Sequence, residues 1–265
     1  MPQLTLADAQ LHYEVRGEGE PLVLIPGFAA GAWIWFKQVA ALSADFQVIT
    51  FDPCGIGQSG CSGAGLDIRS LADHVAGLLR GLGIGRAHIL GASFGGFVAQ
   101  EFALVYPAMT RTLTLCCTSF GGANHVPPST ETLMALASTD GFNTESRVRR
   151  NLMPAFSPEV AGDHSIEVEQ TVNLRMTNPV AEETYRAQLM AALGFDAERE
   201  LPAIKSPTLI VSGDADAIVP VQNSRNLAAK IPNAQLRIIN GGSHLFFIER
   251  PQEFNRIIME FLKHH

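Results

Sequence analysis

The sequence predicts an α/β fold built on a mainly parallel sheet with helices on both faces. Short, continuously apolar segments recur along the chain, which is typical of strands buried on both sides. Segments with helical spacing of apolar residues lie between them, and this alternation favours a parallel sheet. A third observation is the stretch at residues 89–96, where an apolar run ends in G-x-S-x-G and a helical pattern follows.

The first expected strands form an antiparallel hairpin at one edge of the sheet. Residues 3–6 and 10–16 alternate polar and apolar side chains, and residues 7–9 join them. The buried strands follow at residues 21–25, 46–51, 86–90, 112–116, 208–211 and 236–239. Together these segments predict a sheet of eight strands.

Helices are expected between the buried strands. The clearest covers residues 68–82, where leucine and valine side chains recur on one face. A second follows Ser93 directly. Residues 220–230 and 251–262 each begin with proline, which suits the first position of a helix.

The alternation of strands and helices stops between residues 121 and 200. This stretch has no convincing strand pattern, and helical patterns occur at residues 130–137, 145–152, 166–176 and 181–193. We interpret it as a helical lid inserted after the sixth strand, over the strand ends where open α/β sheets bind ligands. The expected organisation is a core domain of residues 1–120, a lid of residues 121–200 and a second core part of residues 201–265.

Composition and charge limit the classes of partner. The 265 residues are 46% apolar, enough for a large buried core, and carry a formal net charge of −7. This charge offers no basic surface for nucleic acid or an anionic membrane, so a small molecule is the expected partner. No apolar run approaches the roughly 18 residues of a membrane-spanning helix. The composition is as compatible with a homo-oligomer as with a monomer.

The cysteine pattern indicates a reducing compartment. Cys54, Cys61, Cys116 and Cys117 show no C-x-x-C spacing, and the chain starts without a charged segment followed by an apolar one. We therefore expect a cytoplasmic protein with free cysteines. Cys54 is expected to be inert, because no basic residue adjoins it in the sequence.

Ser93 is the candidate nucleophile. A strand that turns directly into a helix holds this serine in a strained backbone conformation, and the flanking glycines leave room for the turn. A serine hydroxyl is a weak nucleophile at neutral pH. It needs a base to accept its proton and a carboxylate to orient that base.

Both partners are available later in the chain. Asp214 and Asp216 follow the seventh expected strand and His244 follows the eighth, so all three lie on the same rim of the sheet as Ser93. Their order, Ser then Asp then His, is that of the hydrolase arrangement. The two aspartates alternate like an oxygen-ligand pair, but no further His or carboxylate cluster completes a site, so no metal is expected.

With these motifs the chain resembles the α/β-hydrolase fold family, in its small lid-bearing branch of esterases, enol-lactonases and carbon–carbon bond hydrolases. The resemblance covers nearly the whole chain outside the lid. It implies that Ser93 is the nucleophile, Asp216 the acid in G-x-x-D-x-x-V-P and His244 the base in G-x-S-H. The I-P-G-F segment that ends at Phe28 resembles the oxyanion loop, so the backbone N–H groups of Phe28 and Phe94 are the expected oxyanion hole.

The sequence departs from the family pattern at three positions around these loops. The family commonly has His where Pro26 stands, Arg where Cys54 stands and His where Ala92 stands. None of these changes removes a reacting group, because the oxyanion hole uses backbone donors. The side chains that support both loops must nevertheless differ.

The resemblance implies a cofactor-independent serine hydrolase that cleaves a small carboxylic ester or lactone through an acyl-enzyme on Ser93. Three alternatives use the same fold: carbon–carbon bond hydrolysis, acyl transfer to an acceptor other than water, and a ligand receptor without turnover.

A G-x-G-x-x-G match at residues 55–60 raises a dinucleotide-binding alternative. It fails because no helix pattern opens at its last glycine and no acid follows about 20 residues on.

The expected substrate pocket is apolar and has walls from both the core and the lid. This character favours a substrate with a mainly hydrophobic acyl portion. The candidate lining residues, besides Phe28, are Trp33, Phe120, Met153, Phe156, Met190 and Leu245.

Overall fold

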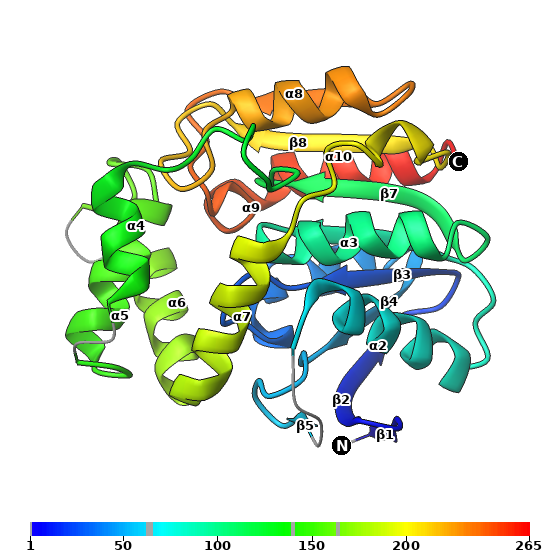
Figure 1. The fold of residues 1–265 in the computed structure, drawn as a ribbon, viewed down its shortest axis with the longest axis horizontal. Helices are drawn as coiled ribbons and strands as arrows, with labels where there is room; N and C mark the ends of the chain where they lie inside the picture. Colours follow the sequence, from blue (N-terminus) through cyan, green and yellow to red (C-terminus); the bar gives the residue numbers. More distant parts are fainter. Residues whose placement is uncertain (1, 62–65, 139–140, 163–164) are drawn as a thin grey trace.

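The structure, a computed structural model, describes residues 2–61, 66–138, 141–162 and 165–265. In these ranges nine strands form one sheet in the order β1-β2-β4-β3-β6-β7-β8-β9, with β5 paired to β2 (Figure 1). The strands are β1 (Gln3–Thr5), β2 (Ala9–Arg16), β3 (Glu20–Ile25), β4 (Phe46–Phe51), β5 (Gly60–Cys61), β6 (Ala87–Ala92), β7 (Thr110–Cys116), β8 (Thr208–Gly213) and β9 (Gln235–Ile239).

The central part of the sheet is parallel. The strands from β4 to β9 along this order pair in parallel, and β1, β2 and β5 add to one edge in antiparallel fashion. This confirms the predicted mainly parallel sheet with a hairpin at its edge. The expected count of eight strands is wrong by one, because β5 has two exposed residues and is too short to show an apolar pattern.

Helices cover both faces of the sheet. Side chains of α2, α3 and α8 pack into one hydrophobic cluster, and those of α1, α9 and α10 pack into another. Val23 and Leu24 in β3 are both fully buried but belong to opposite clusters, which explains why this strand is continuously apolar. The α-helices are α1 (Val39–Leu42), α2 (Ile68–Gly81), α3 (Phe94–Val105), α4 (Thr130–Ala137), α5 (Glu145–Leu152), α6 (Ile166–Thr177), α7 (Glu182–Gly194), α8 (Gln222–Lys230), α9 (Phe246–Glu249) and α10 (Pro251–Leu262).

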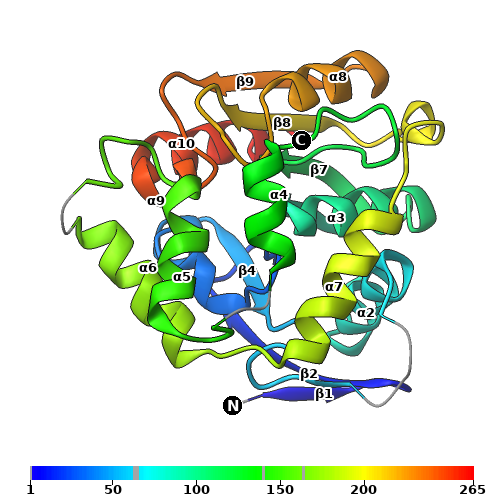
Figure 2. The same ribbon diagram turned by 60° about the vertical axis from the view of Figure 1, so that its left-hand side comes forward.

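Four helices, α4 to α7, lie between β7 and β8 in the chain, where the sequence predicts helical segments. They stand at the left of Figure 1, beyond the arrowheads of β3 and β8, and Figure 2 views the molecule from their side. Gln188 on α7 accepts a hydrogen bond of 2.8 Å from the backbone N–H of Ala29, in the loop after β3. The insertion therefore contacts the carboxyl ends of the core strands. None of the described helices is both long and apolar enough to cross a membrane.

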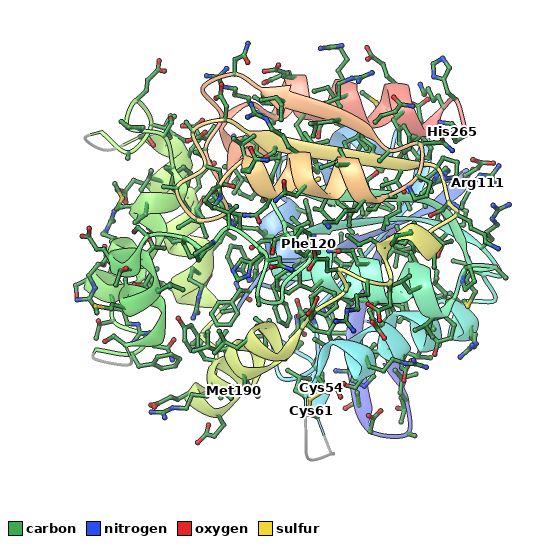
Figure 3. All side chains as sticks on the ribbon, turned by 45° about the horizontal axis from the view of Figure 1, so that its top comes forward. Cys54, Cys61, Arg111, Phe120, Met190 and His265 are labelled. Atoms are coloured by element: carbon green, nitrogen blue, oxygen red, sulfur yellow. A yellow bond between two sulfur atoms is a disulfide. The ribbon has the colours of Figure 1, made fainter. Side chains whose placement is uncertain are left out.

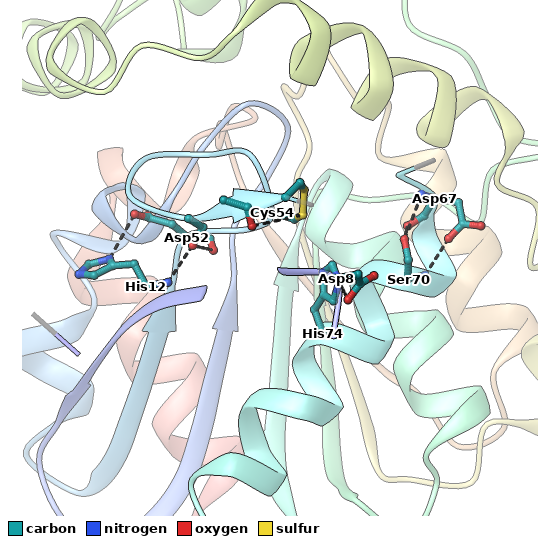
Figure 4. Close-up of a disulfide and its surroundings, with 10 residues drawn as sticks. Asp8, His12, Asp52, Cys54, Asp67, Ser70 and His74 are labelled. Atoms are coloured by element: carbon teal, nitrogen blue, oxygen red, sulfur yellow. Dashed lines mark hydrogen bonds and ion pairs between the residues drawn. A yellow bond between two sulfur atoms is a disulfide. The ribbon is translucent and has the colours of Figure 1, made fainter. Parts of the chain in front are cut away.

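A disulfide links Cys54 to Cys61 across the loop between β4 and β5, with a Cα–Cα distance of 5.3 Å (Figure 4). The expectation that Cys54 is a free cysteine is therefore wrong. Seven positions separate the two cysteines, and no local motif signals that the loop folds back on itself. The expectation of a reducing compartment rested on free cysteines, and this disulfide removes that support. Cys116 and Cys117 are free and buried, as expected.

Candidate active site

Ser93 occupies a sharp turn between β6 and α3. Its backbone has φ of 54° and ψ of −119°, outside the regions that side chains normally allow. A Cβ at Gly91 would collide with the backbone of Gly95, and a Cβ at Gly95 would collide with the carbonyl oxygens of Ile25 and Pro26. These close approaches explain why the turn requires glycine two positions before and after the serine.

Hydrogen bonds hold the strained backbone of Ser93 in place. Its N–H donates to the carbonyl oxygen of Cys116 in β7 at 2.9 Å, and its own carbonyl oxygen accepts from Thr118 Oγ1 at 2.8 Å. The serine is half-buried and lines the cavity described below. The turn thus presents the hydroxyl at a fixed point on the cavity wall.

His244 and Asp216 meet although 28 residues separate them in the chain. His244 Nδ1 lies 2.9 Å from Asp216 Oδ2, and the Asp216 side chain is fully buried. The other carboxylate oxygen of Asp216 accepts hydrogen bonds from the N–H groups of Ile218 and Val219, each at 2.8 Å. An imidazole that donates from Nδ1 to this carboxylate has Nε2 as its acceptor.

Asp214, the competing acid, has a different environment. Its side chain is exposed and accepts a hydrogen bond of 2.6 Å from the N–H of Gly241, which joins the loop after β8 to the loop after β9. His244 bonds to Asp216 alone of the two aspartates. Asp214 therefore supports the loop that carries His244, and Asp216 is the acid that contacts the imidazole.

The predicted oxyanion donors, Phe28 and Phe94, line the same cavity as Ser93. Within the described ranges neither backbone N–H has a hydrogen-bond acceptor. The loop that carries Phe28 is held from two sides: Gln188 binds the N–H of Ala29, and Asp52 Oδ1 accepts from the N–H of Ala32 at 2.9 Å. The unpaired N–H of Phe28 lies on this supported loop, and that of Phe94 lies at the start of α3. Two such donors suit the binding of a negative oxygen.

The cavity has a volume of about 280 Å³ and reaches from Ser93 and His244 to the helices of the insertion. Trp33 and Leu245 line it, as the sequence predicts. The insertion contributes eleven of the lining residues, and its larger or polar ones include Phe142, Asn143, Arg147, Arg175, Tyr185 and Leu189.

Four of the predicted pocket residues do not line the cavity. Met190 is 66% exposed and points away from the molecule, because α7 turns its neighbour Leu189 toward the cavity instead (Figure 3). Phe120 is fully buried in the hydrophobic cluster beside α3. Met153 and Phe156 pack into the second hydrophobic cluster, and neither is among the residues that line the cavity.

Cys117 also lines the cavity, directly after β7. Its burial, and next the charge of Asp216, hold the pKa of this thiol well above its usual value. The thiol therefore stays protonated and is a poor nucleophile.

Sequence reasoning missed several polar residues at the site. Gln188 and Asp52 hold the loop that carries Phe28, and Arg147 and Arg175 lie in the cavity wall. The arginines are the more notable omission, because the predicted pocket was wholly apolar. An arginine in an otherwise amphipathic helix usually faces solvent, so the sequence carried no signal that these two face inward.

Comparison with known proteins places the chain among hydrolases. A family model described as alpha/beta hydrolase fold matches residues 20–251. The chain is 35% identical to a poly(3-hydroxyalkanoate) depolymerase of Ectopseudomonas oleovorans, over 92% of this chain and 84% of that protein. It is 32% identical to 2-hydroxy-6-oxononadienedioate/2-hydroxy-6-oxononatrienedioate hydrolase 2 of Pseudomonas putida, over 97% and 93%. The crystal structure of the enol-lactonase from Burkholderia xenovorans LB400 superposes with a TM-score of 0.88 at 25% identity, over 99% of this chain and 100% of that chain.

Proposed function

Because the chain belongs to the α/β-hydrolase fold family, we propose that it is a cofactor-independent serine hydrolase that cleaves a small carboxylic ester or lactone. The observation that most supports this proposal is the hydrogen bond between His244 and Asp216, on the wall of the cavity that Ser93 also lines. A nucleophile, an oriented base and a buried carboxylate are the three groups that acyl transfer to serine requires.

In the proposed reaction, Ser93 Oγ attacks the carbonyl carbon while His244 Nε2 accepts the hydroxyl proton. Asp216 stabilises the imidazolium that forms, and the N–H groups of Phe28 and Phe94 bind the negative oxygen of the tetrahedral intermediate. His244 then gives its proton to the leaving alcohol. Water enters, loses a proton to His244 and releases the acid, which regenerates Ser93.

Carbon–carbon bond hydrolysis is the second candidate, since one relative carries the name of a hydrolase of dienedioate-type ketones. It uses the same three residues and differs in the bond that breaks. A ligand receptor, which would bind the same compounds without converting them, is a further alternative. Turnover of any substrate would exclude it.

A substrate panel separates these candidates. The wild type and Ser93→Ala are assayed with p-nitrophenyl esters of increasing chain length, an enol-lactone and a dienoate-type ketone. We expect turnover of an ester or the lactone, and a loss of about 10⁶-fold in kcat for Ser93→Ala if the value for the serine of subtilisin applies. Turnover of the ketone alone would favour the second candidate. Full activity in Ser93→Ala would reject the serine mechanism.

A further inference from the structure

Arg147, on α5, is a buried cation that lines the cavity and has no acidic partner among the described residues. The residue is only 3% exposed, and its two terminal nitrogens, Nη1 and Nη2, have no hydrogen-bond acceptor among the described residues. Its guanidinium lies over the rings of Phe142 and Tyr185, at 5.0 and 5.4 Å from the ring centroids. These rings attract the cation and the Tyr185 hydroxyl also interacts with it, but neither side chain supplies a negative charge.

The same helix shows what a paired arginine looks like. Arg149 donates to Glu145 at 2.7 Å and to both carboxylate oxygens of Glu169, at 2.8 and 2.7 Å. Both of these acids face Arg149 on the outer side of the insertion. A buried charge without an anionic partner is unfavourable, so the contrast indicates that the charge of Arg147 is balanced by an anion that enters the cavity.

A second cation, Arg175 on α6, lies in the same wall. One of its nitrogens donates to the carbonyl oxygen of Asn178 at 2.9 Å, and another lies 3.5 Å from Asn143 Oδ1. Burial lowers the pKa of Arg175, and the positive charge of Arg147 lowers it further. Among the described residues that line the cavity there is no aspartate or glutamate, so two positive charges share this wall without a protein anion.

We propose that the cavity takes a substrate with a carboxylate at the end remote from the scissile bond, and that Arg147, with Arg175 beside it, binds this carboxylate. This inference rests on the proposed hydrolase function and specifies its substrate class. A guanidinium presents its N–H groups in a planar fork that matches the two oxygens of a carboxylate. The rest of the cavity wall is mostly apolar and includes Trp33 and Leu189, which suits the hydrocarbon chain that separates the two ends of such a substrate. The expectation of a mainly hydrophobic acyl portion is thereby revised to an acyl chain with an anionic end.

A matched pair of substrates tests the proposal. Mono-p-nitrophenyl adipate carries a carboxylate at the far end, and p-nitrophenyl 6-methylheptanoate replaces it with a neutral branched group of similar shape. We expect the wild type to prefer the adipate ester in kcat/KM by about 10- to 100-fold, the range for hydrogen bonds to a charged group. Arg147→Met should remove most of this preference, by a loss on the adipate ester that far exceeds its loss on the neutral ester. Arg150→Met, which removes an exposed arginine of the same helix, should keep the wild-type preference.

A binding measurement separates this inference from the proposed function. Adipate is titrated into Ser93→Ala by calorimetry, with 1,6-hexanediol as the neutral probe. We expect adipate to bind in preference to the diol, and Arg147→Met in the Ser93→Ala background to abolish that preference. Adipate binding that depends on Arg147, together with a wild type that turns over no ester, would uphold the anion site and reject the proposed ester hydrolysis. Ester turnover with no preference for the adipate ester, together with adipate binding that does not depend on Arg147, would overturn the inference and leave the hydrolase function standing.

Discussion

At the scale of single residues, backbone strain is concentrated around the cavity. In the described ranges, five residues other than glycine have a positive φ, and four of them, Ala29, Ser93, Cys117 and Asn143, line the cavity. Each such conformation is unfavourable and persists only where surrounding contacts enforce it. The hydrogen bonds to the backbone of Ser93 and to the N–H of Ala29 provide that enforcement. This concentration of strain is what a preorganised site requires.

The two aspartates after β8 allow a controlled test of the acid. Asp216→Asn should lower kcat by about 10⁴-fold, because an amide that donates to His244 Nδ1 fixes the imidazole in the wrong tautomer, as in serine proteases. Asp214→Asn is the matched control. Its amide oxygen can still accept from Gly241, so kcat should stay within about twofold of the wild type. Steady-state kinetics on one ester measure both variants, and equal losses would contradict the assignment of Asp216.

The placement of Ser93, Asp216 and His244 on one rim of the sheet was predictable, and most of the cavity lining was not. Ser93, Asp216 and His244 each follow a buried strand within a local glycine-containing motif, so the sequence alone puts them on one rim. Pocket lining depends on how the helices of the insertion rotate about their axes. Leu189 and Met190 are adjacent and both apolar, and only the packed structure shows that Leu189 faces the cavity.

At the scale of elements, three parallel strands carry the candidate groups to one place. Ser93 follows β6, Asp216 follows β8 and His244 follows β9, all at their carboxyl ends. At the amino ends of the strands, side-chain contacts link neighbouring strands. His88, near the start of β6, contacts Thr112 Oγ1 of β7 at 2.9 Å and Glu20 Oε2 of β3 at 3.1 Å, and so links three neighbouring strands.

His88 predicts a pH dependence of stability. Burial lowers the pKa of this imidazole in the folded protein, although Glu20 opposes the shift. Below the ordinary histidine pKa of about 6.5 the unfolded chain binds a proton that the folded protein does not. The stabilisation is therefore present above about pH 6.5 and is lost as the pH falls toward the lower pKa of the folded state.

Urea unfolding of the wild type and of His88→Gln between pH 7.5 and 5.5 measures this effect. Glutamine does not titrate, so the wild type should lose more of its free energy of unfolding across this interval than the variant loses. Parallel curves for the two proteins would show that His88 makes no contribution, and a smaller loss in the wild type would mean that the pKa of His88 is raised on folding.

At the scale of the whole molecule, the core and a helical insertion share the cavity, and a disulfide closes a loop at the edge of the core. The alternating pattern of the sequence predicted the core well, because buried parallel strands and amphipathic helices have distinct periods. The Cys54–Cys61 bridge could not be predicted, since it depends on the path of the loop between β4 and β5. The inward arginines were missed for a related reason: a long-range cavity, rather than local spacing, decides their orientation.

The disulfide should stabilise the fold without taking part in catalysis. Neither cysteine lines the cavity. Closure of a loop this short restricts the unfolded chain, so Cys54→Ser with Cys61→Ser should lower the free energy of unfolding by about 2 to 3 kcal/mol. Denaturant unfolding without reductant measures the change. Reductant should lower the stability of the wild type to that of the double variant and should leave the double variant unchanged. Equal stability of the wild type and the double variant without reductant would contradict the prediction.

The most direct test of the account is to identify the residue that a fluorophosphonate modifies. The protein is treated with the reagent, digested and mapped by mass spectrometry, beside His244→Gln, which lacks the proposed base. We predict one phosphonyl group per chain on Ser93 and strongly reduced labelling in the variant. An adduct on another residue, or no adduct on a protein that hydrolyses esters, would contradict the assignment of Ser93 as the nucleophile.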